Sequence, residues 1–183
     1  AEVPRNPGAW SGLVLAAGPE GSGARAATEA LVAAAELPPD AVELRPLAGE
    51  DAARALVAGE VDAALFVLKL STPILGPLFR NPDLRLLTLD PLQVLARRMP
   101  GAAPITLPMG AIQLSPPLPP ADVGMVSMVA RLVAQDDLHP ALEDRLVLAA
   151  MHMHSGRDAL TERGRFPSAE PGDGPPMSRY AEG

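Results

Sequence analysis

Residues 12–37 read GLVLAAGPEGSGARAATEALVAAAEL, and this stretch decides the fold class. It begins with a short apolar run, continues through a glycine-rich loop at 18–23, and ends in an alanine-rich segment. Apolar residues recur at helical spacing in that segment, which predicts an amphipathic helix with Ser22 as its N-cap. The order strand, loop, helix is the opening of a βα unit.

The chain continues this alternation of strand and helix as far as residue 99. Further strands are predicted at 42–47, 61–68 and 84–89, and further helices at 50–58, 73–79 and 91–99. The run at 61–68 is strongly apolar, which indicates a strand buried on both faces. Successive βα units imply a parallel sheet, so the predicted fold class is α/β.

The composition of the sequence changes at Pro100. Seven prolines lie between residues 100 and 120, which predicts an extended connection and little packed structure. A strand or pair of strands is expected at 123–134, and a helix at 140–154 that begins near Asp137 or His139.

The composition argues against several classes of partner. The formal net charge is -7, whereas proteins that bind nucleic acids or anionic membranes draw affinity from Lys and Arg. The chain has no cysteine, which excludes disulfides, thiolate nucleophiles and thiolate metal sites. We therefore predict no nucleic-acid partner. A small anion stays compatible with this composition, because anion binding depends on local donors and helix ends.

The glycine-rich loop is the first candidate site. Gly18, Gly21 and Gly23 let successive backbone N–H groups point at one spot beside the positive end of the predicted helix. Ser22 adds a hydroxyl donor, and Arg25 lies close enough to cover a carboxylate. The spacing matches neither a P-loop nor a dinucleotide fingerprint. The alternative is an ordinary βα turn in which Ser22 only caps the helix.

Two hydroxyl residues extend this candidate site. Ser71 and Thr72 follow the apolar run at 61–68, at the expected carboxyl end of a buried parallel strand. Open parallel sheets bind ligands outside the carboxyl ends of their strands, so both side chains are expected to face the same crevice. The predicted ligand-binding residues are thus Gly18, Gly21, Ser22, Gly23, Arg25, Ser71 and Thr72.

The sequence gives weak signals for catalysis and for metal binding. His152 and His154 are two residues apart on a predicted helix, so their side chains point apart and do not easily share a metal. A triad of Ser22, His139 and Asp136 can be written on paper, but the G-x-S-x-G elbow that exposes a serine nucleophile is missing. We therefore predict no catalytic residue, no metal and no cofactor, and we do not expect an enzyme.

Five phrases, in order along the chain, resemble the solute receptors of the TRAP-associated extracytoplasmic immunogenic (TAXI) family. They are GPEGSGAR at 18–25, ALVAGEVDAALFV at 55–67, LPMG at 107–110, DLHPAL at 137–142 and FPS at 166–168. One departure stands out, because the family's pattern has a threonine where this chain has Ala24. The resemblance covers most of the chain.

The resemblance implies a type II periplasmic-binding fold, in which two α/β lobes are joined by extended crossovers and the ligand lies in the cleft. It makes 12–104 an α/β ligand-binding lobe with a mostly parallel sheet. It makes 105–166 the crossover and a partial second lobe, a smaller C-terminal α/β portion, and 167–183 a loosely ordered tail. The N-terminal part of the first lobe is absent from the match, which implies a fragment.

The implied function is capture of a small anionic solute, such as a carboxylate, in the periplasm. The implied partners are the membrane subunits of a TRAP-type transporter or the protein's own membrane anchor, since 175–183 is similar to the approach to an anchor. An incomplete fold leaves apolar surface to cover, so a homodimer is also considered. Two alternatives stay open: an effector-binding regulatory domain of the same fold, and a structural or interaction module without a ligand.

Overall fold

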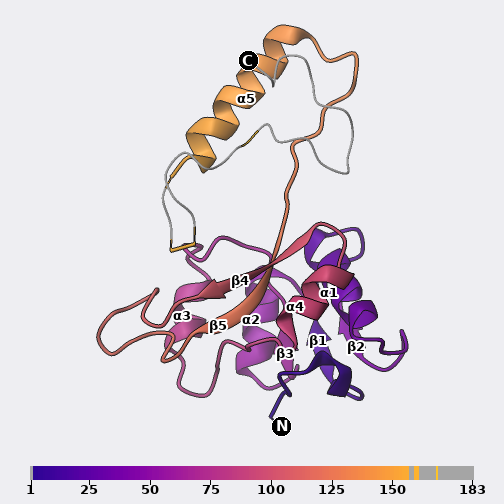
Figure 1. Cartoon of the computed structure of the whole chain (residues 1–183), viewed down its shortest axis with the longest axis vertical. Helices are drawn as coiled ribbons and strands as arrows, with labels where there is room; N and C mark the ends of the chain where they lie inside the picture. Colours follow the sequence, from indigo (N-terminus) through magenta and orange to yellow (C-terminus); the bar gives the residue numbers. More distant parts are fainter. Residues whose placement is uncertain (1, 157–158, 161–167, 169–183) are drawn as a thin grey trace. The chain divides into compact units, whose positions relative to one another are not determined.

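The computed structural model describes residues 2–156, 159–160 and 168 (Figure 1). The chain divides into two compact units, Ala1–Val129 and Ala130–Gly183. The first unit is mixed α/β, with a three-stranded parallel sheet and a two-stranded antiparallel sheet. The predicted α/β class and its parallel sheet are therefore confirmed.

The parallel sheet has β1 at its centre. Strand β1 (Val14–Ala16) pairs on one side with β2 (Glu43–Arg45) and on the other with β3 (Ala63–Ala64). In this register Leu15 lies between Leu44 and Ala63. The strands are joined through α1 (Gly23–Ala34) and α2 (Gly49–Val57), so the two predicted βα units are present.

Helix α1 begins and ends as its sequence dictates. Ser22 is the N-cap, because its side chain accepts a hydrogen bond from the N–H of Arg25. After Ala35 the chain turns through Glu36, which adopts φ 60°, and the Leu37 N–H donates to Val32 O at 3.2 Å. This hydrogen bond from the second residue past the cap is a Schellman motif, with a glutamate at the position that glycine favours.

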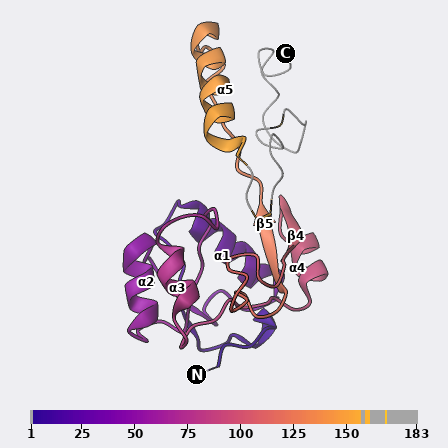
Figure 2. The same ribbon diagram turned by 90° about the vertical axis from the view of Figure 1, so that its left-hand side faces the viewer.

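Three further elements complete the helices of the first unit. They are the 3-10 turn η1 (Pro7–Ala9), α3 (Leu75–Arg80) and α4 (Leu92–Arg98). Figure 2 shows α2 and α3 on one side of this unit and α4 with β4 and β5 on the other. The helices predicted at 73–79 and 91–99 are thus confirmed to within a few residues.

The proline-rich segment contains a strand that was not predicted. Strand β4 (Ala102–Leu107) pairs antiparallel with β5 (Val123–Met128), and Pro104 lies opposite Val126. A two-stranded sheet leaves one side of each strand unpaired, where a proline without an N–H is tolerated. The prediction of an extended connection across 100–120 is therefore wrong for its first part.

Two predicted strands are also corrected. The expected strand at 61–68 is reduced to β3, because β1 ends at Ala16 and offers no further ladder partners. Val67 and Leu68 are 46% and 48% exposed, so this run is not buried on both faces. Residues 84–89 form no strand; the Leu89 N–H donates to Gly124 O at 3.0 Å.

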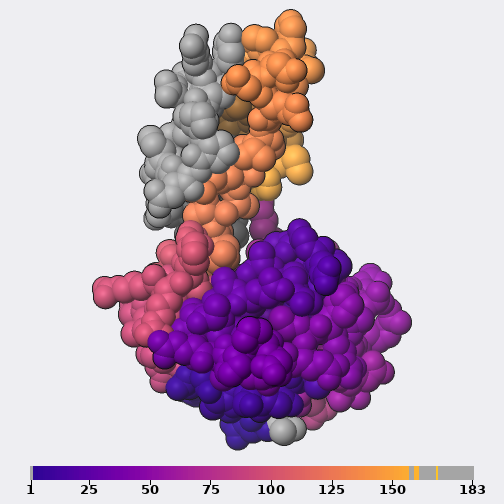
Figure 3. Space-filling view, turned by 90° about the vertical axis from the view of Figure 1, so that its right-hand side faces the viewer, coloured from indigo at the N-terminus to yellow at the C-terminus, as the bar shows by residue number. Residues whose placement is uncertain are grey.

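The core of the first unit consists of two apolar clusters, and Figure 3 shows this indigo-to-magenta part of the chain as a closely packed body. The larger cluster joins Trp10, Leu15, Leu31 and Leu95. The indole N–H of Trp10 donates to Pro4 O at 2.8 Å, which satisfies its polar group. The sequence has one tryptophan, so Trp10 is a natural probe of this core.

The described part of the second unit contains one regular element, α5 (Pro140–His154). It confirms the predicted helix, and His139 caps it by accepting from the Ala141 N–H at 3.2 Å. Within the described part of the chain, no helix has the length and apolarity of a membrane span. The predicted tail at 167–183, including the approach to an anchor, lies outside the described residues except for Ser168.

Candidate functional site

The glycine-rich loop connects the central strand β1 to helix α1. Gly18 and Gly21 adopt φ values of 80° and 77°, in the left-handed region that glycine favours. At Gly18 a Cβ would lie 2.7 Å from the Ser22 Oγ, whereas at Gly21 a Cβ would meet nothing within 4 Å. Glycine is therefore favoured at position 18 by both its backbone conformation and the lack of space, and at position 21 by its backbone conformation alone.

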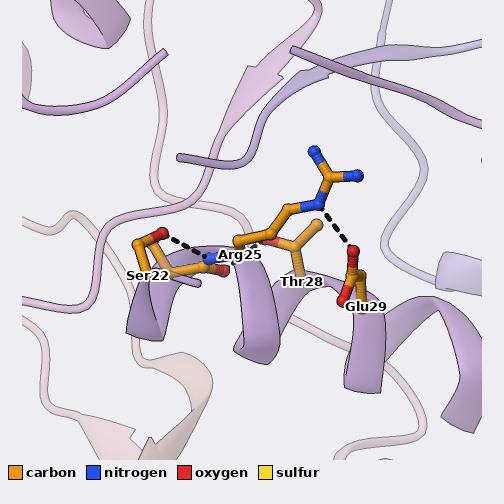
Figure 4. Close-up of polar contacts among 5 residues, drawn as sticks. Ser22, Arg25, Thr28 and Glu29 are labelled. Atoms are coloured by element: carbon orange, nitrogen blue, oxygen red, sulfur yellow. Dashed lines mark hydrogen bonds and ion pairs between the residues drawn. The ribbon is translucent and has the colours of Figure 1, made fainter. Parts of the chain in front are cut away.

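Ser22 connects this loop to the helix. Its Oγ accepts from the Arg25 N–H at 3.1 Å (Figure 4). Its carbonyl oxygen accepts from the Ala26 N–H at 3.0 Å. A serine hydroxyl has one donor and two acceptor lone pairs, so the O–H of Ser22 can still donate to a ligand. The capping role predicted for Ser22 is confirmed, and its ligand role stays a prediction.

An open pocket of about 280 Å³ lies beside the first two turns of α1. Its lining residues are Glu20, Gly21, Ser22, Arg25, Ala26 and Glu29. Its volume is near the lower limit of small-molecule sites, which run from about 300 to 1,000 Å³, so it suits only a small solute. Three of the predicted site residues, Gly21, Ser22 and Arg25, line this pocket together.

Arg25 carries the positive charge of the pocket. Its Nε donates to the Glu29 Oε1 at 2.6 Å, one helical turn further along α1 (Figure 4). The first turn of α1 contains no acidic residue, and the helix dipole disfavours a cation there. The Arg25 side chain is only 20% exposed and that of Glu29 is 55% exposed, so Glu29 supplies the countercharge from the solvent side.

The pocket also contains negative charge that the sequence prediction did not include. Glu20 and Glu29 both line it, against the single guanidinium of Arg25. Arg25 and Glu29 are four residues apart on a predicted helix, a spacing typical of an ion pair. This spacing is the sequence signal that predicts Glu29 as a neighbour of Arg25. The burial of Thr28 on the same helix was also not predicted. Thr28 is fully buried, and its Oγ1 donates to Ala24 O at 2.8 Å.

The remaining predicted site residues lie around or away from the pocket. Gly18 packs beneath Ser22, and Gly23 begins α1. Ser71 and Thr72 are not among the lining residues, because β3 ends at Ala64 and the chain then runs to a turn in which the Thr72 N–H donates to Lys69 O at 3.0 Å. The shortened strand therefore removes the geometric reason that placed them in the crevice.

The other candidate residues either have structural roles or do not come together in a site. The Asp62 Oδ2 accepts from the Val14 N–H at 2.9 Å, which ties the approach to β3 to the start of β1. Ser22 belongs to the first unit, while Asp136 and His139 belong to the second, so neither unit contains the triad. In the described ranges, no group of three or more His, Cys, Asp or Glu side chains could hold a metal ion.

Comparison with protein-family models, with curated proteins and with solved structures gave no match. The functional argument therefore depends on the pocket at the start of α1 and on the chemistry of its lining residues.

Proposed function

We propose that this chain binds a small anionic solute, such as a carboxylate, at the start of α1 and releases it chemically unchanged. The observation that carries the proposal is the position of Arg25, a half-buried guanidinium in the wall of an open pocket beside a helix N-terminus. Guanidinium groups and the N–H groups at helix N-termini are both strong donors to carboxylates and phosphates.

The hydrogen-bond inventory of the first turn supports this proposal. The first N–H groups of a helix have no intrahelical acceptor, and Ser22 Oγ takes only that of Arg25. Among the residues that the structure describes, none accepts a hydrogen bond from the N–H groups of Gly23 and Ala24, which leaves these groups for water or for a ligand. The Ser22 hydroxyl and the terminal nitrogens of Arg25 add further donors, because Glu29 takes only the Nε.

The position of the pocket in the fold also supports a ligand site. The loop at 18–23 follows the carboxyl end of the central parallel strand β1, and open α/β sheets bind ligands at this edge. We propose that the first unit corresponds to a lobe of the type II periplasmic-binding fold, as the resemblance to TAXI receptors suggests. No catalytic group is needed for such a role.

On this proposal the protein acts outside the cytoplasm, in the periplasm. It would deliver its solute to the membrane subunits of a TRAP-type transporter or signal through its own membrane tether. A homodimer is compatible with this role. The competing proposals are an effector-binding regulatory domain and a ligand-free interaction module, and the absence of any stabilising anion would favour the second of them.

The test is a thermal-shift screen of the whole chain against amino acids, dicarboxylates, oxoacids and inorganic phosphate. A ligand present at 100 times its dissociation constant adds about 2.7 kcal/mol of stability, which shifts the midpoint by several degrees. Arg25→Ala should abolish the shift. Arg54→Ala is the matched control, because Arg54 forms a similar ion pair with Asp51 on α2, outside this pocket.

A further inference from the structure

The ion pair between Arg25 and Glu29 places a carboxylate of the protein on one of the guanidinium edges that a ligand carboxylate can use. The Glu29 Oε1 lies 2.6 Å from the Arg25 Nε, and both residues line the pocket. Glu29 therefore blocks one edge of the guanidinium, the edge formed by Nε and one terminal nitrogen. A carboxylate that binds this edge through two hydrogen bonds must displace Glu29.

We infer that Glu29 is an internal counter-ion of Arg25 that competes with the anionic solute and thereby sets the affinity of the pocket. This inference rests on the proposed function. In the free protein Glu29 neutralises Arg25, and the first turn of α1 itself contains no acidic residue. When an anion binds, the Glu29 carboxylate moves into the solvent to which it is already 55% exposed.

Magnitudes decide between competition and the opposite role, in which Glu29 would orient Arg25 for the ligand. An exposed pair four residues apart on a helix is worth about a twofold change in an equilibrium constant, so its orienting effect is small. A Glu29 carboxylate that stayed about 4 Å from the bound anion would weaken binding about fivefold even at the dielectric constant of bulk water, so its displacement into the solvent is favoured. Repulsion and competition therefore outweigh orientation.

Glu20 provides a matched control for this inference. It lines the same pocket and carries the same charge, but no ion pair joins it to Arg25 in the described part of the chain. Glu20→Gln removes repulsion alone, whereas Glu29→Gln removes repulsion and also replaces the charged competitor for the guanidinium with a neutral, weaker acceptor. The difference between the two variants therefore isolates the internal counter-ion.

The experiment is calorimetric titration of the 183-residue chain with succinate and with inorganic phosphate, in wild type, Glu29→Gln, Glu20→Gln and Arg25→Ala. We expect Glu29→Gln to bind one of these anions about two- to tenfold more tightly than wild type, and to gain more than Glu20→Gln. Arg25→Ala should bind neither anion.

The other outcomes separate the inference from the proposed function. Binding by wild type that depends on Arg25 but is equal or weaker in Glu29→Gln would overturn the counter-ion role and leave the proposed function intact. Equal gains in Glu29→Gln and Glu20→Gln would reduce Glu29 to a source of repulsion and would also overturn it. Absence of binding in wild type and in Glu29→Gln alike would contradict the proposed function, and the inference with it.

Discussion

A methyl group added at Gly18 should destabilise the protein in two separable ways. Gly18 adopts φ 80°, and an alanine in that conformation costs about 1–2 kcal/mol. The new Cβ would also lie 2.7 Å from Ser22 Oγ, a distance that forces the hydroxyl to move. If Ser22 moves, α1 loses its N-cap hydrogen bond, which costs about 1 kcal/mol more. Gly18→Ala should therefore cost about 2–3 kcal/mol.

The assay is urea unfolding followed by the fluorescence of Trp10, which is 1% exposed and packs in the same cluster as Leu31 of α1. Gly21→Ala is the matched control, because Gly21 has φ 77° and open space around its Cβ position. It should cost about 1–2 kcal/mol, from backbone strain alone.

A double-mutant cycle separates the two penalties. In a Ser22→Ala background the clash with the Ser22 Oγ and the cap are both absent, so Gly18→Ala should cost the backbone term and a smaller amount from the close contact with the Ala24 Cβ at 3.2 Å. The cycle should give a coupling energy of about 1 kcal/mol between positions 18 and 22. Equal costs for Gly18→Ala and Gly21→Ala, together with zero coupling, would refute the described contact between the loop and the cap.

Two further predictions test other parts of the chain. Glu36 adopts φ 60° at the end of α1, so Glu36→Gly should raise the free energy of unfolding by up to about 1 kcal/mol in the same urea assay. Glu36→Ala is the control, and equal stability of the two variants would count against the left-handed conformation. The loss of its exposed ion pair with Arg98 is a minor cost. The boundary between the two units falls after Val129, and residues 129–137 are exposed. Limited trypsin digestion should therefore cut after Arg131 and leave a folded N-terminal fragment with native Trp10 fluorescence. Early cleavage within the first unit, with loss of that fluorescence, would contradict the boundary.

The sequence predicts those features whose causes are local. Helix α1 and its cap follow from Ser22 and from the helical spacing of apolar residues within a dozen positions. Gly21, Ser22 and Arg25 converge on one pocket because they lie within two helical turns of one another. Local chemistry is therefore sufficient to bring these three residues together, and their ligand-binding role stays a prediction.

The features that depend on distant partners were not predictable in this way. The extent of β3 depends on the length of β1, which ends at Ala16, and the apolar run after Ala64 carries no sign of that limit. Ser71 and Thr72 lie outside the pocket lining for the same reason. Strand β4 exists because β5 pairs with it about twenty residues later, while its local signal is dominated by Pro104 and its neighbours.

The most direct test of an anion site at the start of α1 is an NMR titration of the isotope-labelled chain with the anion that stabilises it most in the thermal-shift screen. The proposal predicts saturable shifts of the backbone amides of Gly23 and Ala24 and of the Arg25 Nε–H, all lost in Arg25→Ala. Saturable shifts confined to other residues, or no saturable shifts with any anion of the screen, would contradict it.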